Sequence, residues 1–272
     1  MIRSLVGRAK KQLSDGGVRG LSHATADLVS RETGLRRLGQ RLRHRFGRDE
    51  IEYCGVRLDM SHSAFTPHIC GAIARGQYEQ EEARFAKQYL HPEVPVIQLG
   101  GGIGYVSTHI DKCLADGVAQ VVVEANPSVV EALKDTRTRN GCDFEIFHSA
   151  YAPDEETVTM SVPHNFWGGS IHRTDGERLI RVDAVDIESL CEIFDIDRFQ
   201  LVCDIEGGEI DLLESEYQLL ESRCDLAIIE FHHHKDEFRD LHSDIRRLKE
   251  RIDNGEFVQI DSEAGVVVYQ AR

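Results

Sequence analysis

The sequence predicts an α/β fold in which a mostly parallel sheet is covered by helices and ends in an antiparallel hairpin. Two observations support this class. From residue 50 onward, short runs of β-branched residues alternate with amphipathic stretches, as they do in parallel sheets with crossover helices. The chain then closes with "GEFVQIDSEAGVVVYQ", two extended runs joined by a turn near residues 262–265. We therefore expect one α/β domain over residues 49–272, preceded by a distinct segment over residues 1–48.

The expected elements follow one another along the chain. Buried runs rich in Val, Ile and Leu predict strands near residues 95–99, 119–124, 143–148, 199–204 and 225–231. Stretches with apolar residues at helical spacing predict helices near residues 104–116, 127–140, 208–221 and 235–251. This order of strands and helices favours a single sheet with its ligands at one edge.

Charge is distributed unevenly between the two segments. Residues 1–48 carry 12 Arg or Lys against 3 Asp or Glu, a net of +9, and the remaining residues carry 20 against 44, a net of −24, which together give −15. The acidic body repels phosphate, so we expect no nucleic-acid partner. The basic segment can form a helix that lies on an anionic membrane or packs against its own acidic domain, or it can be a partly disordered arm. An acidic surface with only 7 lysines is typical of halophilic proteins.

Cysteine spacing and hydropathy predict a cytoplasmic protein. The 7 cysteines are scattered and never spaced as C-x-x-C, so we expect reduced thiols. No run of about 18 apolar residues is present, and the N-terminus lacks the pattern of a signal peptide.

A glycine-rich turn follows the first strand of the repeating pattern. In "VIQLGGGIGYVSTHI" the strand "VIQL" is followed by Gly100, Gly102 and Gly104 and then by a helix. The first amides of such a helix face the crevice above the sheet, where small polar groups bind. A dinucleotide fingerprint G-x-G-x-x-G would need glycine where this chain has Tyr105. The spacing fits the G-x-G-x-G loop of S-adenosylmethionine enzymes instead.

The second strand ends in an acid. In "VVVEANP", Glu124 lies twenty residues beyond Gly104 and at the strand tip. A carboxylate there can accept both ribose hydroxyls of a nucleoside, and Asn126-Pro127 turns the chain into the next helix. The glycine turn and Glu124 together indicate an adenosine-bearing cofactor.

The sequence resembles the FkbM-type class I S-adenosylmethionine-dependent methyltransferases over about residues 76–235. The motifs that carry the resemblance include "GQYEQEEARF", "VIQLGGGIGYVS", "VVVEANPSVVEALKDTRTRNG", "LVCDIEGGEIDLL" and "LAIIEFHH", of which "DIEGGE" with "IIEFH" is the most specific. The resemblance implies a Rossmann-like class I methyltransferase fold, with a seven-stranded sheet whose last strand is reversed. It also implies O-methylation with S-adenosylmethionine as cofactor, often of sugar or polyketide hydroxyls.

The same resemblance indicates a cofactor site. The family usually has an acid at the position of Gln98, where it helps to hold the methionine ammonium, and Gln98 can still accept a hydrogen bond through its carbonyl. The segment around Glu79 packs over the cofactor in this family. The residues expected to bind the cofactor are Glu79, Gln98, Gly100, Gly102, Gly104, Glu124, Ala125, Asn126, Ser149, Ala150 and Asp204.

The chemistry is expected at the carboxyl ends of the strands near residues 199–204 and 225–231. By strand alternation, Asp204 and Glu206 share a side if the extended path continues, as do Glu230 and His232. His232 is the candidate base because imidazole titrates near neutrality, with the acids orienting it or the acceptor.

Alternatives remain open for the site and for the function. The four catalytic candidates can instead bind a divalent cation that lowers the pKa of the acceptor, or the acids can merely form salt bridges. The leading function is an O-methyltransferase that acts on a hydroxyl of a sugar, glycan or related acceptor. The alternatives are a non-catalytic binding module, suggested by Gln98, and an NAD(P)-dependent oxidoreductase, which Tyr105 disfavours.

Overall fold

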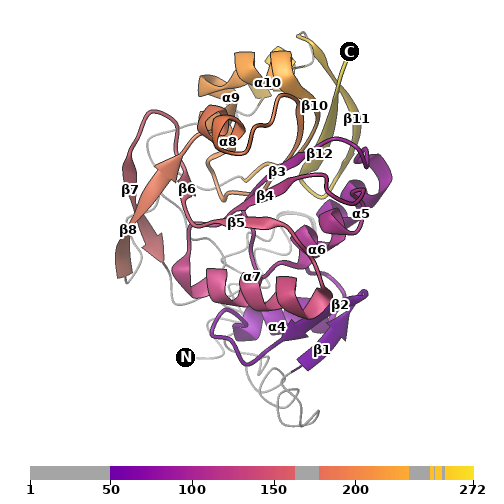
Figure 1. The fold of residues 1–272 in the computed structure, drawn as a ribbon, viewed down its shortest axis with the longest axis vertical. Helices are drawn as coiled ribbons and strands as arrows, with labels where there is room; N and C mark the ends of the chain where they lie inside the picture. The colour runs from indigo at the N-terminus through magenta and orange to yellow at the C-terminus, as the bar shows by residue number, and fades with distance from the viewer. Residues whose placement is uncertain (1–49, 163–177, 233–245, 248, 253–254) are drawn as a thin grey trace, which may run out of the picture.

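The structure is a computed structural model that describes residues 50–162, 178–232, 246–247, 249–252 and 255–272. Its centre is a seven-stranded sheet (Figure 1). In spatial order the strands are β11 (Phe257–Glu263), β12 (Val266–Ala271), β10 (Cys224–Glu230), β9 (Phe199–Cys203), β3 (Val96–Leu99), β4 (Gln120–Val123) and β5 (Glu145–Phe147).

The sheet is parallel except at one strand. β12 runs antiparallel to both of its neighbours, β10 and β11, and the remaining pairs are parallel. The predicted α/β class, the seven strands and the reversed C-terminal strand are confirmed.

Helices cover both faces of the sheet (Figure 1). One face carries α5 (Gln80–Tyr89), α6 (Tyr105–Asp111) and α7 (Pro127–Asn140), and the other carries α8 (Ile187–Ile193), α9 (Glu209–Ser215) and α10 (Tyr217–Arg223). Successive strand residues alternate between the faces. Val96, Val202 and Ile228 pack with the first group, while Leu99 and Leu201 pack with the second.

Several elements were not predicted from the sequence. A hairpin of β1 (Glu50–Tyr53) and β2 (Val56–Asp59) and the helix α4 (Pro67–Ala74) precede α5. A separate three-stranded sheet, in the order β6 (Ala150–Tyr151), β8 (Arg178–Val185) and β7 (Thr157–Val162), follows β5. The chain therefore makes an excursion from the main sheet between β5 and β9.

Two predicted helices differ from the structure. The helix expected near residues 104–116 ends at Asp111. The one expected near residues 208–221 is two helices, because Glu216 interrupts it with φ −111 and ψ 14. The Glu216 carboxylate accepts hydrogen bonds from Ile187 N at 3.0 Å and from Tyr151 Oη at 2.7 Å, so tertiary contacts with the start of α8 hold it at the break.

Some predictions lie wholly or mainly outside the described residues. These are the basic segment 1–48, with its expected membrane contact, and most of the helix near residues 235–251. Within the described ranges, no helix has the length and apolar character needed to cross a membrane. The seven cysteines are all described, and each is a free thiol.

Candidate active site

The candidate site lies where the strand order reverses. β4 and β9 flank β3 on its two sides, and in parallel sheets ligands bind beyond the carboxyl ends of strands at such a reversal. The glycine turn follows β3 there, and Asp204 follows β9. The structure therefore brings the two predicted motifs to one edge.

The glycines of the turn have different roles. Gly100 has φ +89, and a Cβ there would lie 1.9 Å from the Asp204 carbonyl oxygen. Gly104 has φ +86, and a Cβ would lie 3.0 Å from the Thr136 side chain on α7. A Cβ on Gly102 would instead lie 3.4 Å from Glu79 Oε1. Gly100 and Gly104 thus permit close packing, whereas Gly102 faces an acidic side chain of the site.

Glu124 is buried at the tip of β4 and is bonded to the glycine turn. Its carboxylate accepts hydrogen bonds from Gly102 N at 2.9 Å and from Asn126 N at 2.7 Å. Burial raises the pKa of this carboxyl, although the backbone amides act to lower it. Asn126 caps α7, since its Oδ1 accepts from Ser128 N at 3.0 Å. Both side chains therefore shape the turn.

Gln98 is 2% exposed, and by strand alternation it shares a face of β3 with Val96, which packs with α5, α6 and α7. Its Nε2 donates to Gly100 O at 3.0 Å. In the part of the chain that the structure describes, its Oε1 has no hydrogen-bond partner. A buried carbonyl oxygen without a donor is costly, so this atom fits a donor supplied by a ligand.

The expected adenine neighbours lie beyond β5. Ser149 is buried, and its backbone amide donates to Phe147 O at 3.0 Å. Ala150 is buried in an apolar cluster with Met160 and Val182, and Ala125 packs against the same cluster. The chain thus places Ala125 and Ala150 beside one apolar surface next to Glu124.

His232 lies at the centre of a group of carboxylates. Its Nε2 is 3.5 Å from Asp204 Oδ1, 3.7 Å from Glu206 Oε2 and 3.8 Å from Glu230 Oε1. Its Nδ1 is 3.0 Å from Glu209 Oε1, and Glu209 is 1% exposed. The structure brings all four catalytic candidates together.

Backbone geometry holds two of these acids. Glu206 has φ +54, so the extended path does not continue from Asp204, and a left-handed turn brings Glu206 toward His232. Glu209 accepts hydrogen bonds from Ile205 N at 3.3 Å and from Gly207 N at 3.1 Å. Left-handed conformations cost a non-glycine residue about 1–3 kcal/mol and cluster at functional sites.

Two further acids come from the start of α5. Glu79 also has a left-handed backbone, with φ +46. Glu82 is 6% exposed and shares a hydrogen bond with Glu230. We call the following set the acidic edge: Glu79, Glu82, Asp204, Glu206, Glu230 and His232.

Burial and mutual repulsion raise the pKa values of four acids at this edge: Glu79, Glu82, Asp204 and Glu230. Burial raises the pKa of Asp204 to about 7, with the His232 charge acting against it. Burial and the charge of Asp204 raise the pKa of Glu230 to about 10. Burial raises the pKa of Glu79 well above its ordinary value, and Asp204 adds to the shift.

His232 responds in the opposite sense to its neighbours. Burial acts to lower its pKa, but the hydrogen bond to Glu209 and the charges of Asp204 and Glu206 outweigh burial and raise the pKa to about 11. The imidazole is therefore protonated at neutral pH. A protonated imidazole has no free electron pair to accept a further proton, whereas the pKa of Asp204 is about 7.

Replacing Glu230 with glutamine is expected to stabilise the protein at neutral and alkaline pH. The folded pKa of Glu230, about 10, exceeds its ordinary value of 4.5, so wild-type stability falls as pH rises through this window. Its side chain is 27% exposed, which reduces the effect. We expect the free energy of unfolding of Glu230→Gln to exceed that of the wild type by about 2 kcal/mol at pH 8 and to be nearly equal to it at pH 4.5.

Urea unfolding at pH 4.5, 6 and 8 measures this difference. Glu131→Gln is the matched control, because Glu131 is 69% exposed on α7, and it should show no pH trend. A Glu230→Gln variant less stable than the wild type at pH 8 would contradict the explanation.

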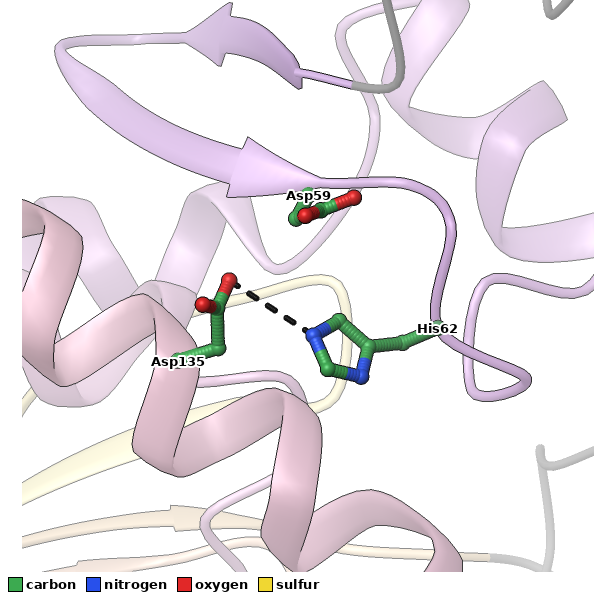
Figure 2. Close-up of side chains that lie close together, drawn as sticks. All are labelled: Asp59, His62 and Asp135. Carbon is green, nitrogen blue, oxygen red and sulfur yellow. Dashed lines mark ion pairs between the residues drawn. The ribbon is translucent and has the colours of Figure 1, made fainter.

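A second histidine and acid cluster lies between the β1–β2 hairpin and α7. Figure 2 shows Asp59 at the end of β2, His62 in the loop that follows it and Asp135 on α7, with His62 Nε2 3.6 Å from Asp135 Oδ2. Arg139 forms ion pairs with Asp135 and with Asp59 Oδ2, the latter at 2.6 Å. It also pairs with Glu50 Oε2 at 2.6 Å. The arginine supplies the positive charge here, so this cluster fastens the β1–β2 hairpin to α7.

Sequence reasoning noted Glu82 and Glu209 in their motifs but gave neither residue a catalytic or a cofactor-binding role. Glu82 is one helical turn beyond Glu79, a spacing that places both on one side of α5. Glu209 begins α9 directly after Gly207-Gly208 and reaches back to His232. The helical spacing offered a signal for Glu82, but only the fold brings Glu209 to a residue 23 positions away.

Comparison with known proteins gives a family and several solved structures. The model of the methyltransferase FkbM domain matches residues 98–253. An O-methyltransferase from Bacillus cereus in complex with SAH is 12% identical, with 71% of this chain and 81% of that chain covered and a TM-score of 0.45. The O-methyltransferase TomG from Streptomyces achromogenes, in complex with SAM, is 12% identical, with 70% and 78% covered and a TM-score of 0.42.

TYW2 from M. jannaschii, in complex with AdoMet, is 15% identical, with 83% of this chain and 88% of that chain covered and a TM-score of 0.40. Comparison with curated protein sequences gives no match.

Proposed function

The chain belongs to the FkbM methyltransferase family, and we propose that it transfers a methyl group from S-adenosylmethionine to a hydroxyl oxygen of a sugar, glycan or related small molecule. The observation that carries this proposal is the acidic edge beside the glycine turn. Buried carboxylates with raised pKa values favour a ligand that brings positive charge.

The charge of the site separates this cofactor from a nicotinamide dinucleotide. S-adenosylmethionine carries a sulfonium and an ammonium, which carboxylates attract. A dinucleotide would bring its anionic pyrophosphate to the glycine turn, where Glu79 faces Gly102 and Glu124 is bonded to it. The carboxyl group of Glu79 offers a pyrophosphate no positive partner, and Tyr105 stands where a dinucleotide fingerprint has glycine, so an NAD(P)-dependent oxidoreductase fits poorly.

The residues of the site fit the parts of the cofactor. Glu79 and Gln98 Oε1 would accept hydrogen bonds from the methionine ammonium. Glu124 would meet the ribose hydroxyls, and Ala125 and Ala150 would contact the adenine ring. Gly102 would leave room for the cofactor next to Glu79, since a side chain there would point at that carboxylate.

The chain's own residues would then prepare the acceptor. The cofactor supplies an electrophilic methyl group on its sulfur. Asp204 would take the proton of the acceptor hydroxyl, because its pKa near 7 leaves part of it ionised and basic at neutral pH. His232 would hold Asp204 and Glu206 in place through its positive charge. Oxygen acceptors need such a base because methylation releases their proton.

Isothermal titration of the full chain with S-adenosylhomocysteine tests the cofactor. We expect micromolar affinity, no binding of NADH, and an affinity about tenfold weaker for Glu79→Gln, which loses a charged hydrogen bond. Glu131→Gln is the control for charge alone. Failure of S-adenosylhomocysteine and S-adenosylmethionine to bind at millimolar concentration would remove this function.

Transfer of labelled methyl from S-adenosylmethionine to a panel of sugars, glycans and lipid-linked sugars tests the acceptor. Label found on a hydroxyl oxygen supports the proposal. Cofactor binding without transfer to any acceptor, in the panel or in a cell lysate, would instead favour a non-catalytic binding module.

A further inference from the structure

We propose that Asp204, Glu230 and His232 bind one divalent cation at the carboxyl ends of β9 and β10. The cation would be one that accepts oxygen and nitrogen ligands together, such as Mn²⁺. The inference rests on the proposed function only for its role, which is to hold the acceptor hydroxyl beside the cofactor and make it easier to deprotonate.

The three donor atoms have the spacing of a coordination group. His232 Nε2 is 3.5 Å from Asp204 Oδ1 and 3.8 Å from Glu230 Oε1, and the three atoms all lie within 4.8 Å of one another. Bonds of about 2.0–2.2 Å to one cation place neighbouring ligand atoms roughly 3.0–3.5 Å apart. A contraction of a few tenths of an ångström brings Glu230 Oε1 into this range of His232 Nε2, and rotation of the two acid side chains would close the group around an ion.

The imidazole is oriented as metal-binding histidines usually are. Its Nδ1 lies against the buried carboxylate of Glu209, which the amides of Ile205 and Gly207 hold in turn. A histidine that binds a metal through one nitrogen commonly donates from the other to a carboxylate. This arrangement directs Nε2 at Asp204 and Glu230, and the cation would take the place of the proton on Nε2.

A buried oxygen beside the group lacks a donor. Glu82 is only 6% exposed. Within the described ranges, its Oε2 has no hydrogen-bond partner. Glu82 borders the proposed site through its hydrogen bond with Glu230. Burying a carboxylate oxygen without a donor is unfavourable, and a water bound to the cation would satisfy it.

The cluster in Figure 2 shows what this site lacks. It also has two acids and a histidine within 4.8 Å, but Arg139 pairs with both of its acids. Across the described residues, neither Asp204 nor Glu230 pairs with an arginine or a lysine. At the acidic edge, the described positive charge beside Asp204 and Glu230 is that of His232, and a cation bound at Nε2 would replace it.

Under this proposal Asp204 serves the reaction with both of its oxygens. Oδ1, the atom that faces His232 Nε2, would bind the cation. Oδ2 would remain for the proton of the acceptor. Charge neutralisation by the cation would also allow Glu230 to remain ionised while buried.

Titration of the full chain with MnCl₂, without any cofactor, tests the site by calorimetry and by the loss of the free Mn²⁺ electron paramagnetic resonance signal. We expect one ion per chain, and an affinity about 10–100-fold weaker for Glu230→Gln and for His232→Gln. Asp135→Asn, at the cluster in Figure 2, is the matched control and should bind Mn²⁺ like the wild type. Circular dichroism verifies that each variant is folded.

Two results would overturn the proposal. One is no Mn²⁺ binding by the wild type at millimolar concentration, and the other is binding that Asp135→Asn weakens while Glu230→Gln leaves it intact. Because the titration contains no cofactor, Mn²⁺ binding with no S-adenosylhomocysteine binding would remove the proposed function alone. S-adenosylhomocysteine binding with no Mn²⁺ binding would remove the metal site alone.

Discussion

Replacing Asp204 with asparagine is expected to lower kcat for methyl transfer by about 10³-fold, since a positioned general base contributes roughly 10²–10⁴-fold. Asparagine has the same shape but cannot take a proton. The affinity for S-adenosylhomocysteine should change far less than kcat, because the glycine turn and Glu124 remain. The loss would therefore lie in the chemical step.

The expected dependence of kcat on pH provides a second test of Asp204 as the base. Without a bound cation, burial raises the pKa of Asp204 to about 7, and only the ionised carboxylate accepts a proton, so wild-type kcat in metal-free buffer should rise as pH passes through 7. The residual activity of Asp204→Asn should lack this rise. Single-turnover transfer of labelled methyl between pH 5.5 and 9 measures both, with Glu131→Gln as control. A variant that keeps more than a tenth of wild-type kcat would exclude Asp204 as the base.

Replacing Gly100 with alanine is expected to destabilise the fold by at least about 4 kcal/mol, among the largest effects of single substitutions. The new Cβ would lie 1.9 Å from the Asp204 carbonyl oxygen, and backbone atoms cannot move aside cheaply. The two strands are fixed on each other nearby, because Asp204 N donates to Leu99 O at 2.9 Å. Relief of the clash would separate β3 from β9.

Gly117→Ala is the matched control for this substitution. Gly117 has φ +83, close to the +89 of Gly100, but a Cβ there meets nothing within 4 Å. It should cost about 1 kcal/mol, the backbone penalty alone. The difference between the two variants in thermal and urea unfolding measures the close approach of the strands. Equal stabilities of the two variants would show that the backbone of Gly100 does not lie as close to the Asp204 carbonyl oxygen as in this structure.

The sequence is most informative where burial determines secondary structure. β3, β4, β9 and β10 lie within or almost within their predicted ranges, because each is a run of apolar, often β-branched residues in the middle of a parallel sheet. The break at Glu216 was not predictable in this way. Its carboxylate is held by Ile187 and Tyr151, which lie 29 and 65 residues away in the chain.

The candidate site was predictable as a location but not as an electrostatic environment. Strand order places Asp204, Glu230 and His232 at one edge, and the sequence indicated as much. The pKa of His232 depends on Glu209, which the sequence does not place against the imidazole. The proposed base is therefore Asp204 and no longer His232, because a tertiary hydrogen bond to Glu209 changes the pKa of the imidazole.

The position of β12 affects how the protein is made. This strand follows β11 in the sequence, yet it lies between β10 and β11. During synthesis, the hydrogen-bonding edge of β10 stays uncovered until residues 266–271 have left the ribosome. An uncovered edge strand of apolar residues can pair with another chain. The nascent protein should therefore depend on chaperones, and variants that weaken β12 should aggregate during expression.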